Sequence, residues 1–107
     1  MEYVIDVESI EAVAREHSDN KHIIRRDDLK VGLISVRPHE HLPVHTHDHE
    51  EQLYYVLEGE GKIHMGDQEF ALSPGKAVLI PPGIAHGVSN PNAVPLRYID
   101  LFINWKR

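Results

Sequence analysis

From about residue 22 onward, the chain is a series of short apolar segments separated by turn-forming residues at regular intervals. Segments that are rich in β-branched and aromatic residues and bounded by Gly, Pro, Asn or Asp are typical of β-strands. The expected strands lie at 22–26, 29–36, 52–59, 61–65, 68–72, 76–80, 85–90 and 95–105. This many short strands with little helix predict an all-β sandwich or small barrel.

The candidate helix lies near the N-terminus, at residues 7–17. Ile10, Val13 and Ala14 would fall on one face of this helix, and Asp6 could cap its first turn. We therefore expect a short N-terminal helical segment ahead of the strands.

Length, charge and cysteine content limit what the chain can be. A length of 107 residues predicts one domain over residues 1–107. The formal charge of −6 argues against a nucleic-acid partner, which would call for a basic face. The short basic run at 21–26 is followed by Asp27 and Asp28, and we interpret it as solvated strand surface. The absence of cysteine, of a signal-peptide pattern and of a long apolar run predicts a cytoplasmic protein without a membrane partner.

Histidine is concentrated just before one of the expected strands. Five of the nine histidines lie within residues 37–61. His45 and His47 are two residues apart on a further probable strand, so both side chains would point to the same face. Two imidazoles on one face of a rigid strand form half of a site for a divalent metal ion. A histidine-rich surface turn would have the same composition, so this segment alone leaves both interpretations open.

Two spaced motifs favour the metal site. The first, H-x-H-x3-4-(E/Q)-x6-G, runs from His45 to Gly59. The second, G-x5-P-x-G-x2-H-x3-N, is matched at every fixed position. Its residues are Gly75, Pro81, Gly83, His86 and Asn90. In this order the two motifs resemble the paired motifs of the cupin superfamily, and the resemblance covers roughly residues 30–103. His39 stands at a place where the first motif often has glycine.

The resemblance implies a double-stranded β-helix, the jelly-roll barrel of cupins, with both motifs at one mouth of the barrel. It also implies one divalent metal ion per chain, which would be manganese, iron, nickel or zinc. His45, His47 and His86 would be three of its ligands. The short segment between the motifs is similar to that of small single-domain cupins. Gly75 and Asn90 are expected to shape turns rather than to contact a substrate.

The fourth ligand would be Gln52 or Glu51. Six residues, Leu53–Glu58, separate Gln52 from Gly59, and at this spacing the usual cupin ligand is glutamate. Strand parity does not choose, because Tyr54 would share a face with Gln52 and Tyr55 with Glu51, and both faces are apolar. The family spacing favours Gln52. An uncharged ligand set would leave the full charge on the ion, so the ion would be a stronger Lewis acid. It also departs from the 2-His-1-carboxylate triad of non-haem iron oxygenases.

Asp100 interrupts an otherwise apolar expected strand. Aspartate is disfavoured inside strands, and here it would share a face with Tyr98 and Phe102. A buried carboxylate needs a partner or a role. Small cupins with a similar first motif often carry an aspartate on the last strand at the metal mouth, which would make Asp100 a general acid or base. The alternative is a structural ion pair. The candidate partners for that pair are Arg25, Arg26 and Arg37.

The chain most closely resembles the small cupins of pectin and uronate breakdown. This resemblance implies a metal-dependent isomerase or lyase that acts on a sugar acid or a similar carbonyl or hydroxy-acid compound. A non-catalytic metal-dependent ligand-binding cupin and a cupin dioxygenase are the alternatives. After Asp100 the chain departs from these relatives, so Lys106 or Arg107 would have to supply any substrate-binding cation.

A second copy of the chain is the expected protein partner, beside a small-molecule substrate. Leu53, Tyr55 and Leu57 would lie on the outside of the barrel if Gln52 is a ligand. An exposed apolar stripe of this kind is expected to be covered by another protein surface or segment. A homodimer would supply it, and the N-terminal segment of the same chain is the alternative.

Overall fold

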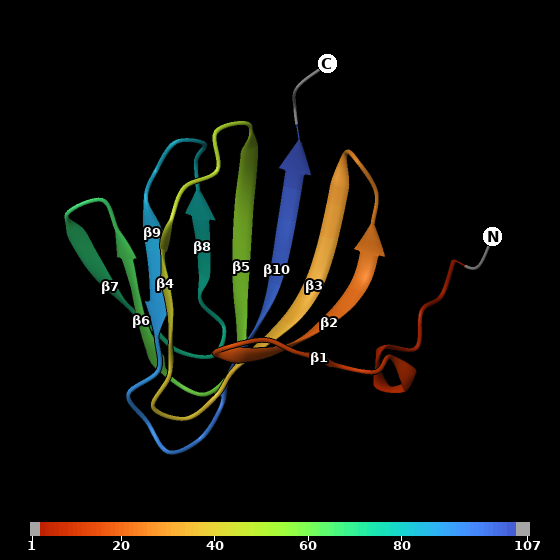
Figure 1. Cartoon of the computed structure of the whole chain (residues 1–107), viewed down its shortest axis with the longest axis horizontal. Coiled ribbons are helices and arrows are strands. Elements are labelled where there is room, and N and C mark those ends of the chain that lie inside the picture. The colour runs from red at the N-terminus through yellow and green to blue at the C-terminus, as the bar shows by residue number, and fades with distance from the viewer. Residues whose placement is uncertain (1–2, 105–107) are drawn as a thin grey trace.

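A computed structural model describes residues 3–104, in which ten β-strands form two sheets (Figure 1). Strand β5, Glu50–Glu58, shows why the sequence folds this way. Gln52, Tyr54 and Val56 are buried along β5, and the residues between them are exposed. This alternation places one face of the strand in the core and the other outside, as expected for a sheet with one covered face.

The larger sheet has six strands in the order β1-β2-β3-β10-β5-β8. Every neighbouring pair in it is antiparallel. Its members other than β5 are β1 Val13–Ala14, β2 Ser18–Arg25, β3 Leu29–Val36, β8 Ala77–Ile80 and β10 Leu96–Asn104.

The smaller sheet has four strands in the order β4-β9-β6-β7. They are β4 His41–His45, β6 Gly61–Met65, β7 Gln68–Leu72 and β9 His86–Ser89. Buried apolar residues from both sheets form one cluster, in which Val56, Ile80 and Tyr98 of the larger sheet meet Ile63 and Val88 of the smaller. The all-β barrel expected from the sequence is confirmed.

The predicted helix at residues 7–17 is wrong. The structure has only a single 3-10 turn there, η1 Val7–Ser9, with the Asp6 carboxylate accepting from the backbone N–H of Glu8 at 3.2 Å. The following residues pair with β2 as strand β1. The Arg37 guanidinium explains the difference, because it donates to the backbone carbonyls of Arg15 and Glu16, which a helix would direct along its own axis.

Several turns follow the sequence closely. Gly66 and Asp67 form the two-residue hairpin turn between β6 and β7, as expected. Gly59 ends β5 with φ of 82°, and a Cβ there would lie 2.3 Å from the Pro95 carbonyl oxygen, so this motif position requires glycine. His39 adopts φ of 63°, the left-handed conformation that glycine would take more easily.

The outer face of the larger sheet carries the expected apolar stripe. Leu53, Tyr55 and Leu57 are 37%, 45% and 40% exposed, so the described part of the N-terminal segment does not cover them. Lys106 and Arg107 lie outside the described residues. Within residues 3–104, no helix has the length and hydropathy needed to cross a membrane.

Candidate metal centre

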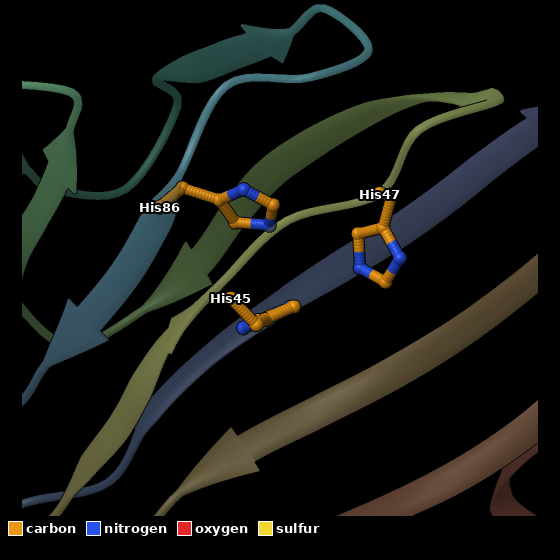
Figure 2. A group of neighbouring side chains, drawn as sticks. All are labelled: His45, His47 and His86. Atoms are coloured by element: carbon orange, nitrogen blue, oxygen red, sulfur yellow. The ribbon is translucent and has the colours of Figure 1, made fainter.

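Three histidines of the two motifs meet between the sheets (Figure 2). His45 is the last residue of β4 and lies directly opposite His86, the first residue of β9. A β-bulge between Leu42 and His45 creates this pairing, because over this stretch β4 contains one residue more than β9. β4 is an edge strand, which is why it tolerates Pro43.

His47 lies in the loop after β4 rather than on the strand that the sequence suggested. Its backbone carbonyl accepts from the N–H of Gly83 at 2.8 Å. Gly83 has φ of 82° in the turn that leads to His86. The second motif therefore holds His47 of the first motif in place, in addition to supplying His86.

The ring nitrogens of the three histidines are suited to one shared ligand. One nitrogen from each ring lies within 4.8 Å of the others. The Nδ1 atoms of His45 and His86 face the carbonyls of Pro43 and Ile84 at 3.0 and 2.9 Å. A carbonyl only accepts hydrogen bonds, so each Nδ1 carries the proton and each Nε2 keeps its lone pair. This arrangement is common for metal-binding histidines.

Gln52 lies on the opposite sheet and lines the same cavity as His45 and His47. Its side chain is 2% exposed, and its Nε2 donates to Asp100 Oδ1 at 3.1 Å. This bond fixes the carboxamide, so the Oε1 atom is the one left to act as an acceptor. Glu51, on the other parity of β5, is partly exposed and pairs with Ile103 across β10. The geometry favours Gln52 over Glu51 as a ligand, and the choice stays a prediction.

The donor set fits a divalent cation. The buried acceptors His47 Nε2, His86 Nε2 and Gln52 Oε1 have no hydrogen-bond partner among the described residues. Buried polar atoms are nearly always partnered, so unpartnered lone pairs on two neighbouring imidazoles, and on an amide that shares a cavity with His47, indicate a ligand that accepts electron density. Burial lowers the pKa values of His47 and His86, and nearby His45 lowers both further. Neutral imidazoles are the form that binds a metal ion.

Asp100 lies beside this group on the inner face of β10. It pairs with Tyr54 of β5 and Gly32 of β3, and it lines a cavity together with Phe102, His45 and His47. Burial raises the pKa of Asp100 to about 7, the Gln52 amide opposes this rise, and Glu50 adds to it. A cation held by the histidines would lower the pKa of Asp100 again.

Among residues 3–104, Asp100 makes no ion pair. Of the suggested arginines, Arg37 binds Asp19 and Arg26 binds Asp28. Arg25 also makes no ion pair within this range, and it is exposed, as expected for a solvated strand surface. It lines a cavity that also contains Asp100.

Asn90 shapes a loop, as expected. It is 1% exposed, and its Nδ2 donates to the carbonyls of Val36, Arg37 and Val94. These bonds hold together the segments at the end of the barrel away from the histidines. Asn90 therefore has a structural role.

The family profile described as cupin domain matches residues 32–102. The chain belongs to the cupin family. Among solved structures, this cupin is similar to KdgF from Halomonas sp., with a TM-score of 0.88, 20% identity and coverage of 99% of this chain and 96% of that one. It is also similar to a predicted oxalate decarboxylase from Thermotoga maritima, with a TM-score of 0.89, 18% identity and coverage of 94% and 98%. At these identities the likeness shows the fold alone.

Curated relatives of this cupin include the mannose-1-phosphate guanylyltransferase 2 of Escherichia coli O157:H7. The two are 33% identical over 72 residues, which is 67% of this chain and 15% of that enzyme. The chain therefore spans only a small part of this relative. Together with the three histidines, these findings show a cupin with sugar-related relatives and a group of side chains that suggests a metal ion.

Proposed function

We propose that this cupin is a metal-dependent enzyme, an isomerase or lyase, that acts on a sugar acid or a similar carbonyl or hydroxy-acid compound. The observation that carries the proposal is the position of a half-buried carboxylate, Asp100, which binds Gln52 and shares a cavity with His45 and His47 of the histidine group. The fold it shares with KdgF and its sugar-related relatives support the choice of substrate class.

His45, His47, His86 and Gln52 would hold one divalent ion. A divalent ion there would supply a Lewis acid, because four neutral ligands leave its charge free to polarise a carbonyl or hydroxyl. The protein contributes a rigid frame: the His45 and His86 rings are fixed by backbone carbonyls, and the Gln52 amide is fixed by Asp100. Orientation of this kind adds to metal affinity and to rate.

Asp100 would move the proton in the reaction. Gln52 binds its Oδ1 atom, which leaves the second carboxylate oxygen available to a molecule in the cavity. In an isomerisation, this oxygen would accept a proton from one carbon of the substrate and return it to another, so no further reactant is consumed. Tyr98 and Phe102 on either side of Asp100 on β10 shield this oxygen from bulk water.

The variant Asp100→Asn tests this role. The asparagine oxygen can still accept from the Gln52 amide, so the amide stays in place while proton transfer is lost. We expect metal content and Tm to remain unchanged, and turnover of uronates, followed by NMR, to fall by about two orders of magnitude or more. Asp100→Leu should lower metal affinity as well, because it removes the acceptor that orients Gln52.

Full activity in Asp100→Asn together with reduced stability would show a structural role instead. The surface variant Asp67→Asn, in the hairpin turn between β6 and β7, controls for the loss of a carboxylate. Oxygen consumption during turnover would indicate a dioxygenase. Stabilisation by sugar acids without any turnover would indicate a non-catalytic binding module.

A further inference from the structure

A continuous cleft runs across the inner face of the larger sheet, from the histidines to β2. A cavity of about 330 Å³ contains His45, His47 and Asp100, and a second cavity of about 210 Å³ contains Asp100, His22 and Arg25. The two share four lining residues, which are Asn20, Ile34, Asp100 and Phe102. Asp100 therefore lies between the metal centre and a part of the cleft that the proposed function leaves unused.

The register of the sheet explains how Arg25 reaches this cleft. Across β2, β3 and β10, His22 pairs with Gly32 and Gly32 with Asp100, which places His22 on the inner face. Unbroken alternation would send Arg25, three residues later, to the outer face. A β-bulge between His22 and Ile24 inserts one extra residue, so Arg25 pairs with inward-facing Lys30. Bulges often redirect a side chain next to a functional site.

The far part of the cleft is basic, although the chain carries a formal charge of −6. Lys30 lies 3.8 Å from Glu50 and is partly neutralised. Arg15 and Arg25 make no ion pair within the described residues. Burial lowers the pKa of His22, and the charges of Arg25 and Arg15 lower it further, so these three basic groups lie near one another. Arg15 lines the cavity that contains His45 and His47, Arg25 lines the adjoining cavity, and His22 lies near both arginines.

We propose that Arg25, assisted by Arg15, binds the carboxylate of a sugar acid whose reacting carbons lie between Asp100 and the histidines. This inference rests on the proposed function and names the residues that would select its substrate. An arginine is suited to the task, because its planar guanidinium can bind a carboxylate through two parallel hydrogen bonds. The required cation then comes from β2, at the beginning of the barrel, rather than from the C-terminal end of the chain.

The dimensions of the cleft favour a substrate of sugar size over a two- or three-carbon acid. Gln52 and Arg25 occupy one row of paired residues across β5, β10, β3 and β2. Three strand spacings separate their backbones by about 14 Å, a span that the two side chains shorten from either end. Gly32 of β3 pairs with Asp100 of β10 and has no side chain, which keeps the cleft open at that point.

Calorimetric titration of the metal-loaded protein tests the proposal with three probes. Galacturonate and galactose differ in a carboxylate at one carbon, and mannose 1-phosphate carries a phosphate instead. We expect the wild-type protein to bind galacturonate more tightly than galactose. Arg25→Met should weaken galacturonate binding about tenfold, the scale of one lost charge-assisted hydrogen bond, and leave galactose binding unchanged. Arg25→Lys should restore only part of the affinity.

Arg26→Met is the matched control, because Arg26 is the next residue and pairs with Asp28 outside the cleft. It should bind galacturonate as the wild type does. Added salt should weaken galacturonate binding by the wild type more than by Arg25→Met, since the missing charge is the one that salt screens. Arg25 is exposed, and an unchanged Tm will confirm that the variant folds.

Three results would overturn the inference: no galacturonate binding by the wild type, equal binding of galacturonate and galactose, or wild-type affinity in Arg25→Met. Tighter binding of mannose 1-phosphate than of galacturonate would show that the cleft prefers a phosphate to a carboxylate, and it would overturn the proposed substrate class. Arg25-dependent binding without turnover would support the subsite and count against the proposed enzyme. Turnover that does not depend on Arg25 would support the proposed enzyme and count against the subsite.

Discussion

Divalent metal should stabilise this cupin against heat. Three buried acceptors at the candidate metal centre, His47 Nε2, His86 Nε2 and Gln52 Oε1, have no hydrogen-bond partner among residues 3–104. An ion bound there would satisfy all three in the folded state. The unfolded chain would hold the ion poorly, because it does not bring these atoms together. Metal removal by a chelator is therefore the informative perturbation.

The expected size of the effect can be estimated in two ways. Each unsatisfied buried acceptor costs about 1–3 kcal/mol, so three of them give several kcal/mol, less what water recovers. A ligand present at a thousandfold above its Kd stabilises the folded state by about 4 kcal/mol. In a domain of about this length, 1 kcal/mol corresponds to about 4–8 °C in Tm. Saturating metal should therefore raise Tm by about 15–30 °C.

Scanning calorimetry of untagged, chelator-treated protein, with and without manganese, iron, nickel or zinc, measures this shift. Elemental analysis should give one ion per chain. In the double variant His45→Ala with His86→Ala, both the shift and the bound ion should be lost. The control double variant, His49→Ala with His64→Ala, should keep both, because neither residue belongs to the cluster of three.

The metal-induced shift should also depend on pH. Protons compete with the ion for the imidazole lone pairs, so the shift should shrink as the pH falls through the histidine range. A stoichiometric ion retained by the double variant His45→Ala with His86→Ala would refute the assignment of the ligands. So would a Tm that no divalent ion changes.

Two further predictions concern the core and the outer face. Burial raises the pKa values of Tyr54 and Tyr98, so their contribution to stability is complete below a pH of about 10 and is lost above it. The absorbance of their tyrosinate forms should therefore appear only together with the loss of circular dichroism. Tyrosinate from either residue in folded protein would contradict this. The exposed stripe of Leu53, Tyr55 and Leu57 should hold two chains together as a homodimer; Tyr55→Lys should sediment as a monomer at micromolar concentration, and a wild-type monomer there would refute the dimer.

The sequence predicted the barrel because local signals and long-range pairing agree. The Gly66-Asp67 turn closes a hairpin, and Gly59 ends β5 where a side chain would collide with Pro95. The metal-centre histidines were identified by motif spacing rather than by strand geometry. His47 lies beyond the end of β4, and a hydrogen bond from Gly83, far away in the sequence, holds it in place.

The helix prediction failed because helical periodicity is a local property. Residues 7–17 carry an apolar spacing that fits one helix face, but Arg37, from the segment after β3, binds the carbonyls of Arg15, Glu16 and Ser18. Asp19 holds the same guanidinium. Tertiary hydrogen bonds of this kind override a weak helix propensity, and nothing in the sequence of residues 7–17 indicates them.

Strand parity predicted side-chain directions only where the ladder is uninterrupted. Gln52 and Asp100 lie on stretches of β5 and β10 that pair without a shift, and both face inward. Alternation placed Asp100 on the face of Tyr98, whereas for Gln52 only the motif spacing favoured this direction, because both faces of β5 are apolar. Arg25 follows a bulge between His22 and Ile24. The residues there are common in strands, so the sequence does not indicate the irregularity. One inserted residue reverses every later direction on a strand, so strand alternation alone would direct Arg25 outward. The inward direction of Asp100 could therefore be predicted from alternation, whereas the placement of the proposed carboxylate-binding arginine required the register of the folded sheet.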